Sequence, residues 1–257
     1  MYKILYPGGK EKAVTFSYDD GTIHDRRLIQ ILDKYGLKGT FHLNSGRMDV
    51  DGYIHSAEVK TLYAGHEVAC HGMQHLFLNQ ISDGELVREL LDDRRRLEQL
   101  SGRIVTGMSY AFGVTNDKII AAAKMLGIQY SRTVADTGSY FVPEDFMRWH
   151  PTCHHQKAIE CPEIVDTFLN PPRYMRPELL YIWGHSYEFA MQNNWTQMEA
   201  LCERLSGNDN IWYATNIEIY RYRKSAEQLI ESADGSMIEN PTGIRIWIEQ
   251  NGVIKIV

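Results

Sequence analysis

The 257-residue sequence has only four cysteines, and no two of them form a C-x-x-C pair. A disulfide framework needs an even set of regularly spaced cysteines, and a cysteine-ligated zinc site needs closely spaced pairs. Cys70, Cys153, Cys161 and Cys202 fit neither pattern. We therefore expect reduced, largely buried thiols and no cysteine-based metal site.

Long apolar runs are also missing. No apolar stretch approaches the roughly 20 residues that cross a membrane, and the apolar part of the N-terminal segment is too short for a signal peptide. If Met1 is the natural start, these absences predict a cytoplasmic protein with no membrane partner. The sequence leaves the oligomeric state open, and a homo-oligomer is compatible with it.

The sequence has no excess of basic charge. It contains 27 basic and 33 acidic residues, which gives a net charge of −6. A basic excess or a basic stripe is typical of nucleic-acid-binding proteins, and this sequence has neither. We therefore expect no nucleic-acid partner. The densest cationic run, residues 94–96, stands beside Asp92, Asp93 and Glu98 and is typical of a solvated helix face.

Strand-like apolar runs alternate with helical patterns along most of the chain. Strands are predicted near residues 12–18, 39–44, 66–70, 104–110, 128–133, 146–150, 179–184 and 211–215. Helices are predicted near residues 25–35, 57–64, 82–100, 116–126, 196–205 and 217–231. Because crossover helices join parallel strands, this alternation predicts an irregular α/β structure, a (β/α) barrel with about seven to eight parallel strands. An open doubly wound sheet is the alternative.

The C-terminal tail has a different pattern. Two apolar stretches, residues 244–250 and 253–257, flank Asn251-Gly252, and this arrangement predicts a β-hairpin with a two-residue type I′ turn. The length suits one large domain with a well-buried core. We predict a barrel over residues 1–234 and a structural hairpin extension of the same domain over residues 235–257.

Unusual polar residues gather where the predicted strands end, which is where parallel α/β folds place functional groups. Asp19 and Asp20 follow one strand, and His71 and His75 follow another. A spacing of four would place both imidazoles on one face of a helical turn, from which they can bind one cation. Gly72 stands where the metalloprotease motif has glutamate, which excludes that class of enzyme.

Adjacent carboxylates repel each other unless a positive group compensates, and a metal ion would do so. Successive side chains leave a strand in opposite directions, so either Asp19 or Asp20 can bind the cation while the other acts as a base toward water. His185 follows the apolar strand near 179–184. Because histidine titrates near neutral pH, it is the candidate to protonate a leaving group.

These motifs resemble those of the polysaccharide deacetylases, carbohydrate esterase family four. Residues 17–21 (Ser-Tyr-Asp-Asp-Gly) are similar to the family's Thr-Phe-Asp-Asp-Gly motif. Residues 65–75 are similar to its Gly-His-Glu and His-(Ser/Thr)-x-x-His segment, with Gly72 in place of the hydroxyl residue. The resemblance spans roughly residues 12–220. It implies Asp19 as catalytic base and one divalent metal ion, zinc by default with cobalt, nickel or manganese as alternatives, bound by Asp20, His71 and His75.

The later motifs are less well matched. His185 resembles the family's fifth-motif histidine, a general acid. Residues 109–113 (Ser-Tyr-Ala-Phe-Gly) stand where the third motif has Arg-Pro-Pro-Tyr-Gly. Phe112 can still offer its backbone N–H to an oxyanion, because that role needs no side chain. The arginine that orients the catalytic aspartate in the family is missing at Ser109, and Arg148 is a candidate replacement from another strand.

Aromatic and polar residues near the predicted strand ends are candidates for substrate contact, since aromatic rings stack on sugar faces. With no clean fourth motif, Trp149 is the candidate to line an acetyl pocket. The pair His154-His155 has no spacing that suits one metal ion and predicts a surface loop. The full set of predicted substrate contacts is Trp149, Tyr110, Asn44, Tyr187 and Arg148.

Three functions follow from these patterns. The first is a metal-dependent hydrolase of carbohydrate metabolism that removes an N-acetyl or related acyl amide group from a soluble oligosaccharide or small sugar. The second is a hydrolase of a cyclic amide, imide or other small amide on the same fold. The third is a non-catalytic carbohydrate-binding relative. The altered third motif at Ser109 and the lack of a signal segment favour a small substrate over a cell-wall polymer.

Overall fold

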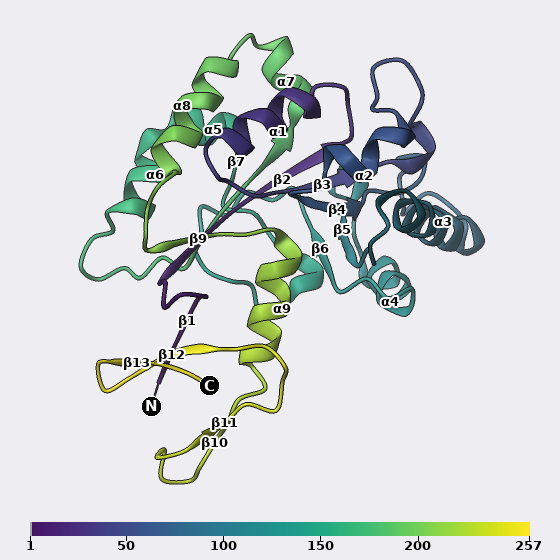
Figure 1. Ribbon diagram of the computed structural model, residues 1–257. Helices are drawn as coiled ribbons and strands as arrows, with labels where there is room; N and C mark the ends of the chain where they lie inside the picture. Colours follow the sequence, from purple (N-terminus) through teal and green to yellow (C-terminus); the bar gives the residue numbers. More distant parts are fainter. Residues whose placement is uncertain (1) are drawn as a thin grey trace.

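A curled sheet of parallel strands forms the centre of the structure, with helices packed around it (Figure 1). The structure is a computed structural model, and it describes residues 2–257. The parallel strands are β2 (Lys12–Asp20), β3 (Gly39–Leu43), β4 (Glu67–Cys70), β5 (Gly107–Ser109), β6 (Tyr130–Arg132), β7 (Cys153–His154), β8 (Leu179–His185) and β9 (Ile211–Tyr213). Their order is β6-β5-β4-β3-β2-β8-β7, and β9 pairs with β2 beside β3.

The sheet curls far enough for its two ends to be joined by one segment. Trp149 forms a parallel bridge with Arg132 of β6, and the N–H of Thr152 donates to the carbonyl oxygen of Tyr181 in β8. The order runs in chain sequence from β2 to β6, without the central reversal of a doubly wound sheet. The predicted irregular barrel with seven to eight parallel strands is therefore confirmed.

Helices follow most of the strands, and several of them begin at a residue whose side chain caps the helix. Ser82 and Glu85 form the predicted capping box of the long helix, and Gly102 ends it with φ 69°. Its continuous periodic pattern made this helix predictable. The α-helices are α1 (Asp25–Lys34), α2 (Val59–Leu62), α3 (Asp83–Ser101), α4 (Asp117–Met125), α5 (His155–Glu160), α6 (Pro162–Leu169), α7 (Ser186–Met191), α8 (Trp195–Leu205) and α9 (Asn216–Ala226).

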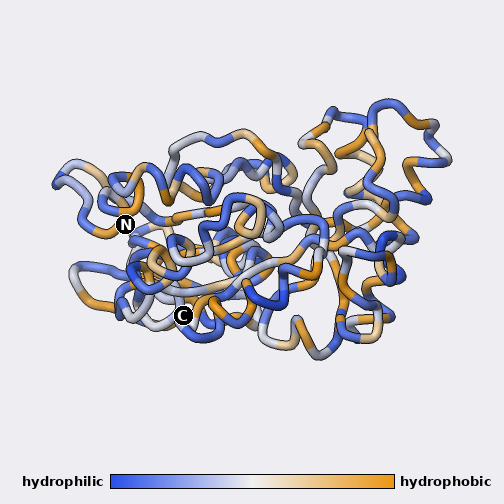
Figure 2. Tube along the Cα trace, turned by 90° about the horizontal axis from the view of Figure 1, so that it is seen from above, coloured by the Kyte–Doolittle hydropathy of each residue, from blue (hydrophilic) through white to orange (hydrophobic). Residues whose placement is uncertain are grey.

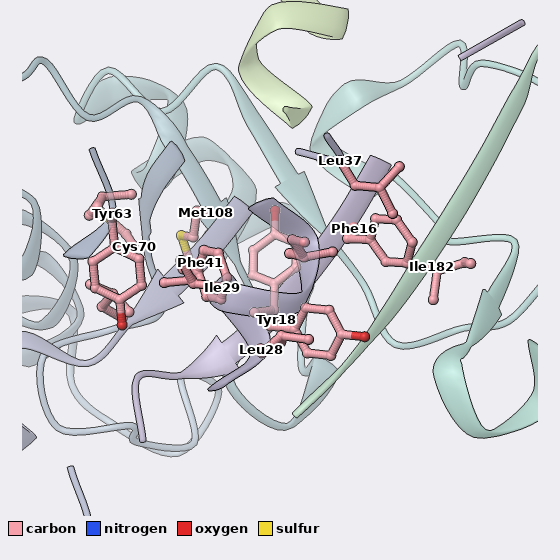
Figure 3. Packing of buried hydrophobic residues seen from close by; sticks show 14 of the residues in the cluster. Phe16, Tyr18, Leu28, Ile29, Leu37, Phe41, Tyr63, Cys70, Met108 and Ile182 are labelled. Atoms are coloured by element: carbon pink, nitrogen blue, oxygen red, sulfur yellow. The ribbon is translucent and has the colours of Figure 1, made fainter. Parts of the chain in front are cut away.

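The largest apolar core lies between the sheet and the helices around it. Figure 3 shows Phe16 and Tyr18 of β2 beside Phe41 of β3, Leu28 of α1 and Ile182 of β8, all fully buried. Burying each such side chain stabilises the fold by about 1.5–3 kcal/mol. Hydrophilic segments run along many of the outer loops (Figure 2). This packing fixes the strand ends, where the polar residues stand.

Some predicted elements differ in the structure. Residues 146–150 are not a strand, because the Asp145 side chain accepts the N–H of Met147 and starts the short 3-10 helix η4 (Phe146–Arg148). Three further 3-10 helices are η1 (Ser45–Arg47), η2 (Ser56–Glu58) and η3 (Ala111–Gly113). The helix predicted to residue 231 ends at Ala226. No sequence pattern predicted β7, α5, α6 and α7, because these elements are short and carry few periodic positions.

The predicted C-terminal hairpin is confirmed as β12 (Trp247–Gln250) and β13 (Val253–Ile256). Asn251 and Gly252 have φ of 54° and 75°, as a type I′ turn requires. β1 (Lys3–Leu5), which no sequence pattern predicted, pairs with β12, so the N-terminal strand lies beside the C-terminal hairpin (Figure 1). A second small hairpin pairs β10 (Ile230–Glu231) with β11 (Ile238–Glu239). The boundary after residue 234 remains a prediction.

The described residues include no membrane-spanning helix and no disulfide bond. Within residues 2–257, no helix combines the length and the apolar character that a membrane span needs. All four cysteines of this part of the chain are free thiols, and Cys70, Cys153 and Cys202 are buried.

Candidate metal centre and active site

Three metal-ligating side chains converge at the carboxyl ends of β2 and β4. Oδ1 of Asp20 lies 3.6 Å from Nε2 of His71 and 3.5 Å from Nε2 of His75. The two Nε2 atoms are 3.1 Å apart. Ligand atoms about 2.0–2.2 Å from a zinc-like cation are themselves separated by about 3–3.6 Å. The donor set and its spacing therefore fit one divalent cation.

His71 is oriented by a hydrogen-bond chain behind it. Its Nδ1 lies 2.7 Å from Oγ of Ser109 and 3.0 Å from the Ser109 carbonyl oxygen. The Ser109 hydroxyl in turn donates to Oδ1 of Asp19 at 2.9 Å. Nδ1 of His71 therefore carries the proton and donates it to Ser109. This tautomer leaves the lone pair of Nε2 free to bind a metal ion.

His71 and His75 do not lie on the predicted helical turn. They belong to an irregular loop after β4, in which Gly72 and His75 have φ of 81° and 59°. A Cβ on Gly72 would lie only 2.8 Å from Oε1 of Glu89. Both the left-handed backbone and this close approach favour glycine, which explains why Gly72 replaces the hydroxyl residue of the family motif.

Two acidic side chains of α3 accept hydrogen bonds from backbone N–H groups at the site, including those of the loop that carries His71 and His75. Asp93 accepts the N–H of His71 at 3.1 Å and the N–H of Ser45 at 2.9 Å. Glu89 accepts the N–H of Gln74 at 2.8 Å. Asp93 is fully buried, and this burial raises its pKa to about 7. The prediction that Asp93 lies on a solvated helix face was wrong.

Backbone strain is concentrated at this edge of the sheet. Three of the six non-glycine residues with positive φ in the described chain are Asp20 (80°), His75 (59°) and Phe112 (57°). Such conformations cost about 1–3 kcal/mol each and persist where the surrounding structure enforces them, often at functional sites. Here they coincide with two of the three candidate metal ligands.

Asp19 is a buried carboxylate beside the three ligands. Its Oδ2 lies 3.7 Å from Nε2 of His71 and forms an ion pair with the guanidinium of Arg132. Burial alone would raise the pKa of Asp19, but the positive charges of Arg132 and then His71 hold this pKa well below its usual range. Asp19 is therefore ionised and available as a base.

Arg132, at the end of β6, pairs with Asp19 in the role that was predicted for Arg148. Arg132 is completely buried, and its Nε donates to Oγ of Ser17 at 3.0 Å. Arg148 instead lies at the surface, where it pairs with Asp145 and Asp117. The structure thus does not bring Arg148 to the site.

His185 is the last residue of β8, the strand that pairs with β2 on the edge opposite to β3, and it lies next to Asp19 in the sheet. Its Nδ1 lies 3.2 Å from Oε1 of Glu188, which caps the start of α7. Burial alone would lower the pKa of His185, but the hydrogen bond with Glu188 and the charge of Asp19 raise it above its ordinary value. A histidine of this kind is suited to proton donation.

Of the remaining predicted substrate contacts, Tyr187 and Asn44 lie near the site. The ring of Tyr187 lies 5.2 Å from that of His185. Asn44 is buried and donates to the carbonyl oxygens of His71 and Gly72, so Asn44 supports the loop that carries His71. Tyr110 and Trp149 lie in the interior. Tyr110 is buried and its hydroxyl donates a hydrogen bond to the carbonyl oxygen of Met147, and Trp149 is a fully buried core residue.

An aromatic pair that the sequence analysis did not include borders the candidate metal centre. The rings of Phe77 and Phe112 are stacked, with centroids 3.8 Å apart and planes 5° apart. Their exposed fractions are 42% and 48%. The Phe112 ring also meets the His75 ring edge to face at 4.3 Å. We call Phe77 and Phe112 the aromatic ledge.

The part of the chain that carries the candidate metal centre matches a known family. Residues 7–131 match the family model "Polysaccharide deacetylase". This segment, which holds Asp19, Asp20, His71 and His75, belongs to that family, and the resemblance read from the first two motifs is confirmed. His185 lies beyond the matched residues.

Individual relatives support the same fold. A peptidoglycan-N-acetylglucosamine deacetylase from Bacillus cereus is 26% identical over 121 residues, 46% of this chain and 55% of that protein. The chain thus spans about half the length of the curated relatives it matches. A candidate polysaccharide deacetylase from Mycobacterium smegmatis has a TM-score of 0.66 at 18% identity, over 88% of this chain and 95% of the other. A pseudoenzyme of carbohydrate esterase family four from Bacillus anthracis has a TM-score of 0.54 at 17% identity, over 84% and 66%.

Proposed function

We propose that the protein is a metal-dependent hydrolase that removes an N-acetyl or related acyl amide group from a small sugar or soluble oligosaccharide. The observation that carries this proposal is the convergence of Asp20, His71 and His75 beside the ionised carboxylate of Asp19. A non-catalytic binding protein has no need of a buried base held by its own arginine, Arg132.

The three convergent side chains offer two imidazole nitrogens and one carboxylate oxygen. This donor set suits zinc, and cobalt, nickel or manganese are alternatives. When bound, a divalent cation at this place supplies Lewis acidity toward a carbonyl oxygen and lowers the pKa of water. The Ser109 contacts to His71 keep Nε2 directed at the cation position.

Three residues of the chain act on the reacting groups, and three more hold them in position. The Asp19 carboxylate accepts a proton from the attacking water, while Ser109 and Arg132 hold its two oxygens in place. The backbone N–H of Phe112 donates to the oxyanion that forms at the acyl carbon. His185 protonates the departing nitrogen, and Glu188 keeps it charged and oriented.

The aromatic ledge is the proposed stacking surface for the sugar. Phe77→Ala should therefore raise KM for an N-acetyl sugar about 5–10-fold, the loss of one aromatic contact, and leave kcat within about twofold. Steady-state kinetics of acetate release measures both constants. Tyr174→Ala is the matched control, because exposed Tyr174 precedes the opposite, amino-terminal end of β8. An unchanged KM in Phe77→Ala would remove the ledge from the substrate site.

The substrate class is tested by a screen of the zinc-loaded protein. Small N-acetylated sugars and their oligomers are assayed for acetate release, and cyclic amides and imides are assayed for ring opening. We expect acetate release that depends on Asp19. Ring opening without acetate release would support the cyclic-amide function instead, and saturable sugar binding without either reaction would support a binding protein.

A further inference from the structure

A second group of metal-ligating side chains lies on the far side of His185 from the first. His154 ends β7, His155 begins α5 and Glu188 lies in α7. Oε2 of Glu188 is 3.0 Å from Nε2 of His154 and 3.3 Å from Nε2 of His155. One ligand atom from each of the three residues lies within 4.8 Å of the others. The prediction of a surface loop for this histidine pair was wrong.

His155 is fully buried, and neither of its ring nitrogens has a hydrogen-bond partner among the described residues. Its ring is packed between Phe189 and Tyr18, whose centroids lie 4.1 Å and 5.8 Å away. A buried polar atom without a partner has lost its hydrogen bonds to water and gained none in return, which destabilises the fold. Such atoms are rare in folded proteins and call for a physical reason.

The position of the His155 ring is imposed by the strand behind it. A Cβ on Gly184 of β8 would lie 2.0 Å from Nδ1 of His155, so only glycine leaves room for the ring. With Nδ1 against β8, the opposite nitrogen, Nε2, lies toward Glu188. The ring cannot move away from the carboxylate without disturbing the core around Phe189.

We propose that His154, His155 and Glu188 form a second divalent-cation site, which takes zinc or a similar transition metal. Separations of 3.0 and 3.3 Å between ligand atoms are those expected around one such cation. Occupation would give Nε2 of His155 the partner that it otherwise lacks. It would also place the proton of His154 on Nδ1, at the expense of the long 3.3 Å contact from the N–H of Gln156.

This site is separate from the one formed by Asp20, His71 and His75 and does not depend on the proposed reaction. The proposed second site nevertheless shares one carboxylate with the proposed general acid, His185. Oε2 of Glu188 faces the two histidines, while Oε1 lies 3.2 Å from Nδ1 of His185. The Glu188 carboxylate would therefore bind the second cation through one oxygen and the proposed general acid, His185, through the other.

The test counts zinc bound per chain after equilibrium dialysis against a fixed free zinc concentration, followed by elemental analysis. We expect two equivalents for the unaltered protein. We expect one for His75→Gln, one for His154→Gln, and none for the double variant. His55→Gln is the matched control, because the His55 side chain is 64% exposed and belongs to neither site; it should keep two equivalents. If His154→Gln bound as many equivalents as the unaltered protein, the proposal would be overturned.

Two further measurements locate the second equivalent and guard against misfolding. In crystals soaked with zinc, anomalous scattering at the zinc edge should show a peak between His154, His155 and Glu188; its absence at full occupancy of the first site contradicts the proposal. His154 is 21% exposed and tolerates substitution better than buried His155. In His75→Gln, zinc should still raise Tm, and this rise should disappear when His154→Gln is added. Loss of the first equivalent alone would count against the proposed function and not against this site.

Discussion

Arg132→Met is expected to lower acetate release by about 10²–10⁴-fold, the contribution typical of general base catalysis. Arg132 and Asp19 are both buried and form an ion pair, so removing the guanidinium leaves the Asp19 charge without compensation. Breaking a buried pair in this way destabilises a protein by roughly 3–5 kcal/mol. Urea unfolding measures the stability, and steady-state acetate release measures the activity of the folded fraction.

Arg148→Met is the matched control, because Arg148 is the arginine that the sequence alone suggested. Its partners Asp145 and Asp117 are surface residues, and exposed ion pairs contribute little to stability. We expect unfolding and kcat close to those of the unaltered protein. A large loss in Arg148→Met together with an active Arg132→Met would reverse the assignment made from the structure.

Asp19→Asn is expected to reduce kcat by about 10²–10⁴-fold while the first zinc equivalent stays bound. The amide cannot accept the proton, but Asp20, His71 and His75 remain in place to hold the metal ion. Asp20→Asn should instead lose the zinc, and its activity with it. Elemental analysis and acetate release on the same preparations separate the two effects.

These two variants test which of the adjacent aspartates binds the metal ion and which acts as the base, because the sequence spacing does not distinguish them. Adjacent aspartates at one strand end are equivalent by sequence pattern, and the family resemblance alone assigned Asp19 as base. In the structure, Asp19 is bonded to Ser109 and Arg132, whereas Asp20 faces both histidines. Zinc lost from Asp19→Asn but retained by Asp20→Asn would exchange the two roles.

Local patterns predicted much of the fold because they depend on neighbouring residues. The capping box at Ser82 and the turn at Asn251-Gly252 were both found at the expected places. The region between residues 146 and 191 was harder, since its strands and helices are two to eight residues long and bury only a few positions each.

The site was predictable where its residues are close in sequence. His71 and His75 were identified from their spacing, although they meet through a strained loop rather than through a helix. Arg132 could not be found this way, because it is 113 residues from Asp19 and reaches it only through the order of strands in the sheet. Nothing in a short strand ending Tyr-Ser-Arg distinguishes Arg132 from a surface arginine.

Asp93 is a different case, because a signal was present. Glu89 and Asp93 are spaced by four and lie on the same face of α3 as Leu86, Leu90 and Leu97, which are buried. The neighbouring cluster of charges suggested a solvated face. The apolar spacing on either side indicated that these two acids point inward, where they bind the loop N–H groups.

The most direct test of the proposed metal-dependent hydrolysis is acetate release from a small N-acetyl sugar before and after removal of metal. Chelation followed by dialysis should abolish turnover, and one equivalent of zinc, cobalt, nickel or manganese should restore it in the unaltered protein but not in His71→Ala. Both results follow if the cation bound by Asp20, His71 and His75 is required for the reaction. Full turnover by a chelated, metal-free sample would contradict the mechanism.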